Sequence, residues 1–369
     1  MSGPLRVGVI GCGGIAQMMH LPFLAERPDL FTITALADPN RAVLEAAGRR
    51  YAVDRLHIGH RDLLEEPIDA VLILSGGSHR QAAVDAIRSG RHVLCEKPLG
   101  ENLAEVEEVE VALRRADVTL MVGYHKRYDP GYELACAEVR RLKDLRFVRV
   151  EILHPVDARA RDHYRFEPPT DPATEALKDD EATDGLDDAV HRSDARGRIE
   201  AIVGVNAPDD QRVATFLLFN SLIHDTNALR GMLGEPEDVV HAEAWRGGRC
   251  MHVLLRWSGS VRASLTWVYL PGLRHYKEEL LFLSPEGRVS LTFPSPYYRH
   301  FPSPVRIDAM ESGALVERTV TVSYEEAFRA ELHHFHACVR DRVPPRTGIA
   351  DARADAVLLE RIARAFGKS

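Results

Sequence analysis

Short apolar runs alternate with helical patterns over the first 124 residues of the chain. Near-continuous apolar strands separated by helices are typical of a parallel sheet that is covered on both faces. The pattern therefore predicts an α/β fold whose first part is a doubly wound parallel sheet. Pro22 is expected to kink or end the first helix, because proline lacks a backbone N–H group. The expected strands are 7–10, 31–37, 69–75, 92–95 and 119–122.

The rhythm changes after Gly123, where apolar and polar residues begin to alternate along several segments. Alternation with a period of two predicts half-buried strands, and the turn sequence at 258–260 predicts a hairpin between two of them. The second part is therefore expected to be α+β with a mostly antiparallel sheet. Its expected strands are 146–153, 239–245, 251–257, 261–269, 279–284, 289–293 and 315–322, and its expected helices are 132–142, 213–233, 325–341 and 351–366.

An acidic segment interrupts the second part. Residues 157–188 carry eleven Asp or Glu against four Lys or Arg. This composition predicts a solvated surface insertion, and a lid over a binding site is the alternative.

A glycine-rich turn follows the first apolar run and leads directly into a helical pattern. A strand, a glycine turn and a helix in this order form a cradle for a pyrophosphate, because the helix N-terminus offers unpaired N–H groups to the anion. Gly11 permits the tight turn, Gly13 permits close backbone approach, and Ala16 lets the helix pack on the sheet. The residues of this turn are Gly11, Cys12, Gly13, Gly14, Ile15 and Ala16.

An acidic residue, Asp38, follows the second apolar run at the distance typical of dinucleotide sites. Its carboxylate would bind both hydroxyls of an adenosine ribose and repel a 2′-phosphate. The sequence thus predicts NAD as the cofactor. NADP is the alternative, because Arg41 is near enough in sequence to contact a 2′-phosphate.

Length, net charge and cysteine content indicate the number of domains, the kinds of binding partner and the cellular compartment. The 369 residues suggest two domains at roughly 150 residues each. The formal net charge of −8 argues against a general nucleic-acid or anionic-membrane surface. No apolar run approaches the ~20 residues of a membrane helix, and no signal-peptide pattern precedes the first strand. The five cysteines are scattered, which predicts a reducing compartment, and we expect a cytoplasmic protein.

Three further segments resemble signatures of the glucose-fructose oxidoreductase, inositol dehydrogenase and MocA (Gfo/Idh/MocA) family. Residues 89–99 read SGRHVLCEKPL and contain its Glu-Lys-Pro signature. Residues 123–130 read GYHKRYDP and resemble the segment that leaves its nucleotide domain, and residues 220–234 read NSLIHDTNALRGMLG and resemble its catalytic helix. The resemblance covers nearly the whole chain outside the acidic segment.

The resemblance implies a domain organisation and an assembly. It implies an NAD(P)-binding Rossmann domain at 1–124 and a substrate-binding and oligomerisation domain at 125–369, with the insertion at about 157–212 and the C-terminal helices packing back. The open sheet of the second domain would mediate a homodimer or homotetramer.

The resemblance also implies which residues carry the chemistry. Lys97 would reach both the nicotinamide ribose and the reacting hydroxyl, and Pro98 would follow a cis peptide bond. His224 would be the acid/base, since an imidazole with a pKa near ~6.5 can accept the hydroxyl proton as the hydride leaves. The spacing of Asn220, His224 and Asn227 would place all three on one helical face. Further cofactor contacts would be Ser75, His79, Glu96, Pro98 and Arg127, and Asn220 would be a further substrate contact. Tyr128 and His154 are candidate substrate contacts for a different reason, because aromatic faces and hydrogen-bond donors suit a polyol.

The expected function is therefore an NAD-dependent oxidoreductase that transfers a hydride between nicotinamide and a secondary hydroxyl or ketone of a sugar, inositol or sugar derivative. Asn220 departs from the family, which commonly has Asp at that position, so an imidazolium at His224 would be less supported. The alternatives are a cofactor-retaining lyase, isomerase or glycoside-cleaving enzyme, and a non-catalytic dinucleotide-binding regulator. No metal site is expected, and the clustered His333, His334 and His336 are interpreted as structural.

Overall fold

The computed structural model describes residues 3–155, 163–164 and 193–368, so most of the acidic segment lies outside the described residues. The chain divides into two compact units. Unit 1 contains the described residues up to Tyr124, residues 163–164 and Phe328–Ala356. Unit 2 contains the described residues of His125–Asp162, Leu186–Ala327 and Val357–Ser369.

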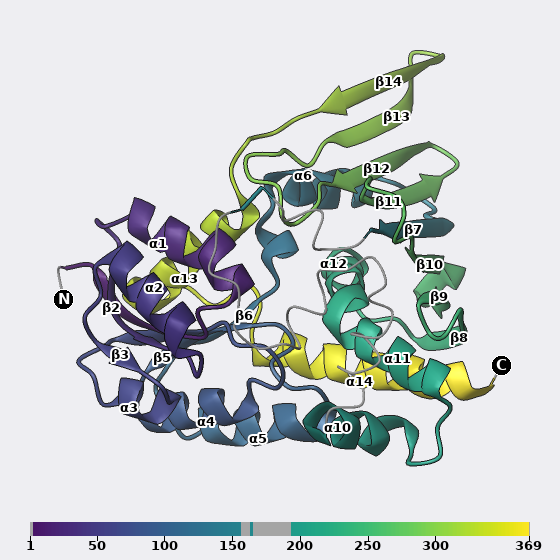
Figure 1. Cartoon of the computed structure of the whole chain (residues 1–369). Coiled ribbons are helices and arrows are strands. Elements are labelled where there is room, and N and C mark those ends of the chain that lie inside the picture. The colour runs from purple at the N-terminus through teal and green to yellow at the C-terminus, as the bar shows by residue number, and fades with distance from the viewer. Residues whose placement is uncertain (1–2, 156–162, 165–192, 369) are drawn as a thin grey trace. The chain divides into compact units, whose positions relative to one another are not determined.

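Unit 1 is built on a parallel sheet of six strands in the order β3-β2-β1-β4-β5-β6. The strands are β1 (Leu5–Ile10), β2 (Phe31–Ala37), β3 (Leu56–His57), β4 (Ala70–Ile73), β5 (His92–Glu96) and β6 (Leu120–Gly123). The helices are α1 (Leu21–Glu26), α2 (Arg41–Tyr51), α3 (His60–Leu64), α4 (Arg80–Arg88), α5 (Leu103–Leu113) and α13 (Ala327–Arg340). Figure 1 shows α1, α2 and α13 on one face of this sheet and α3, α4 and α5 on the other. The predicted doubly wound sheet is confirmed, although β3 is too short to give a periodic signal.

The first helix differs from the prediction. Residues Ala16–His20 form a π-helical segment, and α1 follows without a break, with Pro22 in its first turn. Proline has no backbone N–H group, and the change from the π-helical to the α-helical repeat lies directly before it. The helical segment therefore continues past Pro22 to Glu26.

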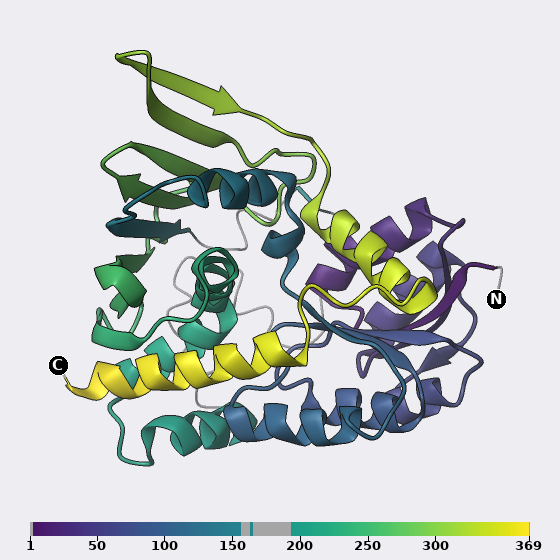
Figure 2. The ribbon, with the colours of Figure 1, turned by 180° about the vertical axis from the view of Figure 1, so that it is seen from behind.

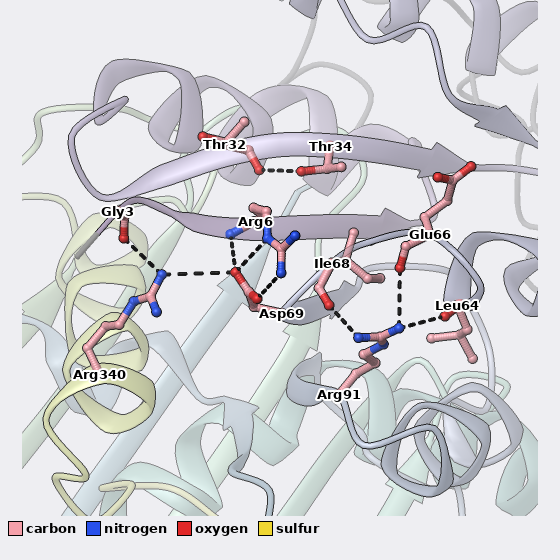
Figure 3. A network of polar contacts seen from close by, with 10 residues as sticks. All are labelled: Gly3, Arg6, Thr32, Thr34, Leu64, Glu66, Ile68, Asp69, Arg91 and Arg340. Atoms are coloured by element: carbon pink, nitrogen blue, oxygen red, sulfur yellow. Dashed lines mark hydrogen bonds and ion pairs between the residues drawn. The ribbon is translucent and has the colours of Figure 1, made fainter. Parts of the chain in front are cut away.

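Polar contacts join the end of the sheet opposite the glycine turn (Figure 3). Arg6 in β1 donates to both carboxylate oxygens of Asp69, at 3.1 Å from Nε and 2.6 Å from Nη2. Arg340 in α13 donates to the carbonyl oxygen of Gly3 at 2.9 Å, and Arg91 donates to that of Ile68 at 2.6 Å. Figures 1 and 2 agree in placing α13 beside α1. The C-terminal helix α13 is thus part of unit 1.

Unit 2 is built on an eight-stranded sheet in the order β14-β13-β12-β11-β7-β10-β9-β8, in which only β7 and β10 pair in parallel. The strands are β7 (Phe147–His154), β8 (Asp238–Trp245), β9 (Cys250–Arg256), β10 (Arg262–Tyr269), β11 (Lys277–Ser284), β12 (Gly287–Phe293), β13 (Val305–Glu311) and β14 (Ala314–Val320). The mostly antiparallel sheet is confirmed, but β13 was not predicted. Val305 and Ile307 are buried and alternate with Arg306 and Asp308, and the Asp308 carboxylate pairs with Arg288 and Arg306.

The helices of unit 2 are α6 (Pro130–Val139), α10 (Ser193–Val203), α11 (Asp209–Leu217) and α12 (Ile223–Leu233), with α14 (Ile349–Ala365) shared between the units. A π-helical segment, Leu218–Leu222, joins α11 to α12, and 3-10 turns cover His125–Tyr128, Ser258–Ser260 and Phe366–Lys368. The described end of the expected insertion, residues 193–212, thus contains α10 and the first turn of α11. Figure 1 shows β13 and β14 as a hairpin at one edge of the second sheet. Across the described residues, every helix is too short or too polar to cross a membrane.

Candidate functional site

The glycine turn of unit 1 adopts the geometry that its sequence predicts. Gly11 has a φ of +91°, and a Cβ added there would lie 2.5 Å from the backbone nitrogen of Ser75, so only glycine fits. A Cβ added at Gly13 would meet no protein atom within 4 Å, which leaves open space beside this backbone. Ala16 is fully buried and begins the π-helical segment. The turn therefore combines a tight bend with room for a ligand.

Asp38 joins the end of β2 to this turn. Its Oδ2 accepts a hydrogen bond from the backbone nitrogen of Cys12 at 2.8 Å, and its Oδ1 accepts one from that of Asn40 at 2.8 Å. A carboxylate has about four acceptor sites, so both oxygens retain capacity for the hydroxyls of a ribose. Asp38 thus holds the turn in place and can still bind a sugar.

The loop after β4 is tied to the Glu-Lys-Pro segment by His79. One ring nitrogen lies 2.6 Å from the carbonyl oxygen of Ser75, and the other lies 2.7 Å from that of Pro98. His79 is 2% exposed, so its ring joins two loops at the carboxyl ends of β4 and β5. The peptide bond between Lys97 and Pro98 is cis, as the family resemblance implies.

Lys97 follows β5 in unit 1 and is half-buried, whereas the preceding Glu96 is buried. The Glu96 carboxylate accepts from the backbone nitrogen of Lys97 at 3.2 Å through Oε2. Its Oε1 lies 2.9 Å from Nε2 of His20, which is fully buried. Glu96 is expected to contact the cofactor, and its two oxygens also contact these protein groups.

His224 belongs to unit 2 and is the second residue of α12, directly after the π-helical segment. Its ring packs edge-on against that of His125, with centroids 5.0 Å apart. Asn220 lies within the π-helical segment, is exposed and donates to the carbonyl oxygen of Phe216 at 2.9 Å. π-Helical segments are frequent at functional sites.

The expected polar face of this helix is not formed by all three residues. Asn227 is 1% exposed, and its side-chain and backbone oxygens lie 3.4 and 3.5 Å from Nη1 of Arg127. The prediction that all three residues share one face assumed 3.6 residues per turn throughout. The π-helical segment Leu218–Leu222 has wider turns, so Asn220 is displaced around the helix axis relative to the residues of α12. Asn220 is therefore exposed, while Asn227 packs inside unit 2.

The other expected substrate residues lie in different surroundings. Tyr128 is 3% exposed and belongs to the core of unit 2. His154 ends β7, with its ring 5.5 Å from that of Trp267 and 5.6 Å from that of Tyr276. Trp267 in turn stacks on Tyr269 at 6.3 Å. An aromatic surface of this kind suits the apolar face of a sugar.

Sequence reasoning missed a buried ionic cluster beside His224, formed by Lys126, Asp225, Tyr276 and Glu278. Lys126 Nζ contacts one oxygen of Glu278 and lies 3.6 Å from Oδ1 of Asp225, while Tyr276 donates to the other oxygen of Glu278. Lys126, Asp225 and Glu278 are 7%, 2% and 0% exposed. The only sequence signal was a charged residue at an inward-facing position of β11, where Leu280 and Phe282 also point inward.

Burial separates the protonation states of the two carboxyl groups. Burial and the negative charge of Glu278 raise the pKa of Asp225 well above its usual value. Burial opposes ionisation of Glu278 as well, but the charge of Lys126 and the surrounding hydrogen bonds outweigh burial and lower its pKa. The charges of Lys126 and Glu278 therefore compensate each other, and Asp225 is neutral.

The described residues contain no group of three or more His, Cys, Asp or Glu that could hold a metal ion. The histidines of α13 make separate contacts instead. His333 lies 2.6 Å from Arg27, His334 accepts from the backbone nitrogen of Arg346 at 3.1 Å, and His336 packs against Phe31. Their interpretation as structural residues agrees with these contacts.

Comparison with known proteins places the N-terminal part in a family. Residues 5–124 match the model of the oxidoreductase family with an NAD-binding Rossmann fold. An inositol 2-dehydrogenase of Gluconacetobacter diazotrophicus is 36% identical over 132 residues, which cover 35% of this chain and 39% of that protein. The match to this curated relative thus spans well under half of its length.

Two solved structures share the fold over almost the whole chain. A 3-ketoreductase from Actinomadura kijaniata, in complex with TDP-benzene and NADP, superposes with a TM-score of 0.71 at 21% identity and covers 98% of both chains. An aldose-aldose oxidoreductase from Caulobacter crescentus, complexed with glycerol, superposes with a TM-score of 0.74 at 21% identity and covers 99% of this chain and 98% of that one. At this identity the likeness shows the fold of both units.

Proposed function

Because residues 5–124 of this chain match the model of the Gfo/Idh/MocA oxidoreductase family, we propose that the protein is an NAD-dependent oxidoreductase. Its substrate is a sugar, an inositol or a sugar derivative, and a hydride passes between the nicotinamide and a secondary hydroxyl or ketone. The observation that carries this proposal is the glycine turn, where Asp38 anchors Cys12 while open space lies beside Gly13. This arrangement suits a pyrophosphate at the turn and a ribose at the carboxylate.

Asp38 supports NAD over NADP. A 2′-phosphate would bring negative charge against this carboxylate, which two backbone N–H groups hold in place. Arg41 is exposed and lies 3.8 Å from Glu45, so a second carboxylate also competes for its charge.

The bound nicotinamide supplies the hydride chemistry, and we assign the remaining roles to side chains of this chain. Lys97 binds and polarises the substrate oxygen through its ammonium group. His224 accepts the hydroxyl proton during oxidation and returns it during reduction. His154 and Tyr269, which are partly exposed and flank the buried Trp267, offer aromatic faces on which a sugar ring packs.

We further propose that copies of the chain associate through the sheet of unit 2 as a homodimer or homotetramer. Exposed apolar side chains on three of its strands support this, namely Val240 in β8, Met310 in β13 and Leu315 in β14. Light scattering coupled to size-exclusion chromatography tests the assembly, and a monomer mass at micromolar concentration would contradict it.

Calorimetric titration with NAD⁺ and with NADP⁺ tests the cofactor, after an aliquot has been denatured to detect dinucleotide carried through purification. We expect NAD⁺ to bind more tightly, and Asp38→Ser to reduce this preference. Asp54→Ser, which changes an exposed aspartate of the same unit, is the matched control and should leave the preference unchanged. Absence of binding by either dinucleotide, with none carried through purification, would refute the proposal.

A further inference from the structure

Glu96 contacts a residue of unit 1 that is distant in sequence, since His20 lies 76 residues before it. His20 ends the π-helical segment that follows the glycine turn, and Lys97 follows β5. One carboxylate oxygen of Glu96 lies 2.9 Å from the ring of His20, and the other accepts from the backbone N–H of Lys97 at 3.2 Å. A single buried carboxylate thus joins the helix of the glycine turn to the backbone of Lys97.

The groups around this carboxylate are buried. His20 is fully buried, and its ring packs edge-on against Phe328 of α13 at 5.5 Å. Glu331, one turn further along α13, is also fully buried. Among the described residues, neither of its carboxyl oxygens has a hydrogen-bond partner.

Glu331 is neutral in this environment. Burial, together with the negative charge of Glu96, raises the pKa of Glu331 well above its usual value. Glu96 differs from Glu331 in that its two oxygens contact His20 and the backbone of Lys97.

The strand order shows which half of the nucleotide site the Lys97 loop serves. The order reverses at β1, so β2 with Asp38 lies on one side of the glycine turn and β4 and β5 lie on the other. In a doubly wound sheet the two halves of a dinucleotide bind on opposite sides of this point. Lys97 therefore belongs to the half that does not hold the adenosine.

We propose that Glu96 is a positioning residue, which sets the orientation of Lys97 through its simultaneous contacts with His20 and the Lys97 backbone. This inference rests on the proposed dinucleotide function, because Lys97 is the residue through which it acts. The length of the Glu96 side chain is the property that matters, because the carboxylate must reach both the ring of His20 and the backbone N–H of Lys97.

Two substitutions separate geometry from charge. Glu96→Gln keeps the length and an oxygen that accepts from the Lys97 N–H. Glu96→Asp keeps the charge but is one methylene shorter, so it cannot span both partners. Glu331→Gln is the matched control, since glutamine resembles the neutral carboxyl and should behave as the wild type.

The experiment compares binding of NADH, followed by the fluorescence of its nicotinamide, with binding of ADP, which lacks the nicotinamide half. We expect Glu96→Asp to weaken NADH binding by about 10- to 100-fold, the range for loss of a charge-assisted hydrogen bond, and to leave ADP binding unchanged. Glu96→Gln should bind NADH as the wild type does. In a Lys97→Ala background, Glu96→Asp should cause no further loss, because its effect passes through Lys97.

Three results would overturn the inference. The first is that Glu96→Asp binds NADH with the affinity and the nicotinamide fluorescence of the wild type. The second is that Glu96→Gln and Glu96→Asp lose NADH affinity equally. The third is that Glu96→Asp loses ADP affinity as much as it loses NADH affinity. A wild-type protein that binds neither ADP nor NADH would instead refute the proposed function, so the two failures are distinguishable.

Discussion

Replacing Asp225 tests the assignment of charges in the buried cluster of unit 2. If Asp225 is neutral, Asp225→Asn keeps the shape and the hydrogen-bonding capacity of the side chain. At a pH near ~4, where the unfolded chain also protonates this carboxyl, we expect the free energy of unfolding of unit 2 to change by no more than ~1 kcal/mol, although Asp225 is only 2% exposed. A buried ionised carboxylate lost from its partner would cost about 3–5 kcal/mol instead.

The partner substitution should depend on whether Asp225 is present. In Glu278→Gln, Asp225 can ionise in its place, because its Oδ1 lies 3.6 Å from Lys126 Nζ. The expected cost is then about 1–2 kcal/mol. The double variant leaves the buried ammonium of Lys126 without either carboxylate and should cost about 3–5 kcal/mol. The two changes are therefore expected to be strongly non-additive.

Urea unfolding followed by tryptophan fluorescence measures these changes. The chain has three tryptophans, and Trp245, Trp257 and Trp267 all lie in unit 2, so the signal reports on that unit. Glu279→Gln is the matched control: this neighbouring carboxylate pairs with the half-exposed Arg149, and its loss should cost ~1 kcal/mol or less. A cost of ~3 kcal/mol or more for Asp225→Asn alone would refute the reasoning, because Asp225 would then be the ionised partner.

The pH dependence gives a second check with a definite sign. The pKa of Asp225 is higher in the folded chain than in the unfolded chain. Its contribution to stability is therefore fully present below the unfolded pKa near ~3.9 and is lost as the pH rises through the folded value. The wild type should lose stability relative to Asp225→Asn as the pH rises above ~4, and a difference that does not change with pH would contradict the raised pKa.

The remaining predictions concern the proposed site and the thiols. Lys97→Ala and His224→Ala should each abolish turnover while ADP still binds normally, and full activity in either variant would remove the assigned role. Gly11→Ala should destabilise unit 1 and abolish dinucleotide binding, because its Cβ would lie 2.5 Å from the Ser75 nitrogen at a φ of +91°, and calorimetry that matches the wild type would contradict this. Burial raises the pKa of Cys12 to about 12, and all five cysteines are buried, so a thiol reagent at pH 8 should label the protein only after denaturation. Labelling of Cys12 in the folded protein would show that the turn opens.

The sequence by itself determined the parts of this protein that depend on local periodicity and local backbone geometry. The parallel sheet follows from its apolar runs, and the glycine turn follows from Gly11, whose conformation only glycine adopts freely. The cis bond before Pro98 followed from the family resemblance. β13 was not predicted, although Val305 and Ile307 alternate with Arg306 and Asp308 there. The burial of Asp308 depends on Arg288 and Arg306, which pair with its carboxylate.

Only the tertiary structure decided which polar groups meet and which of them are charged. Lys126 and Glu278 are separated by 152 residues, and no local pattern signals a pair at that distance. The contact of Glu96 with His20, 76 residues away, and the burial of Asn227 against Arg127 likewise depend on neighbours that the sequence pattern does not reveal. Periodicity shows which side of a helix or strand is buried. The partner of a buried ionisable side chain, and therefore its protonation state, depends on which residues the rest of the fold brings next to it.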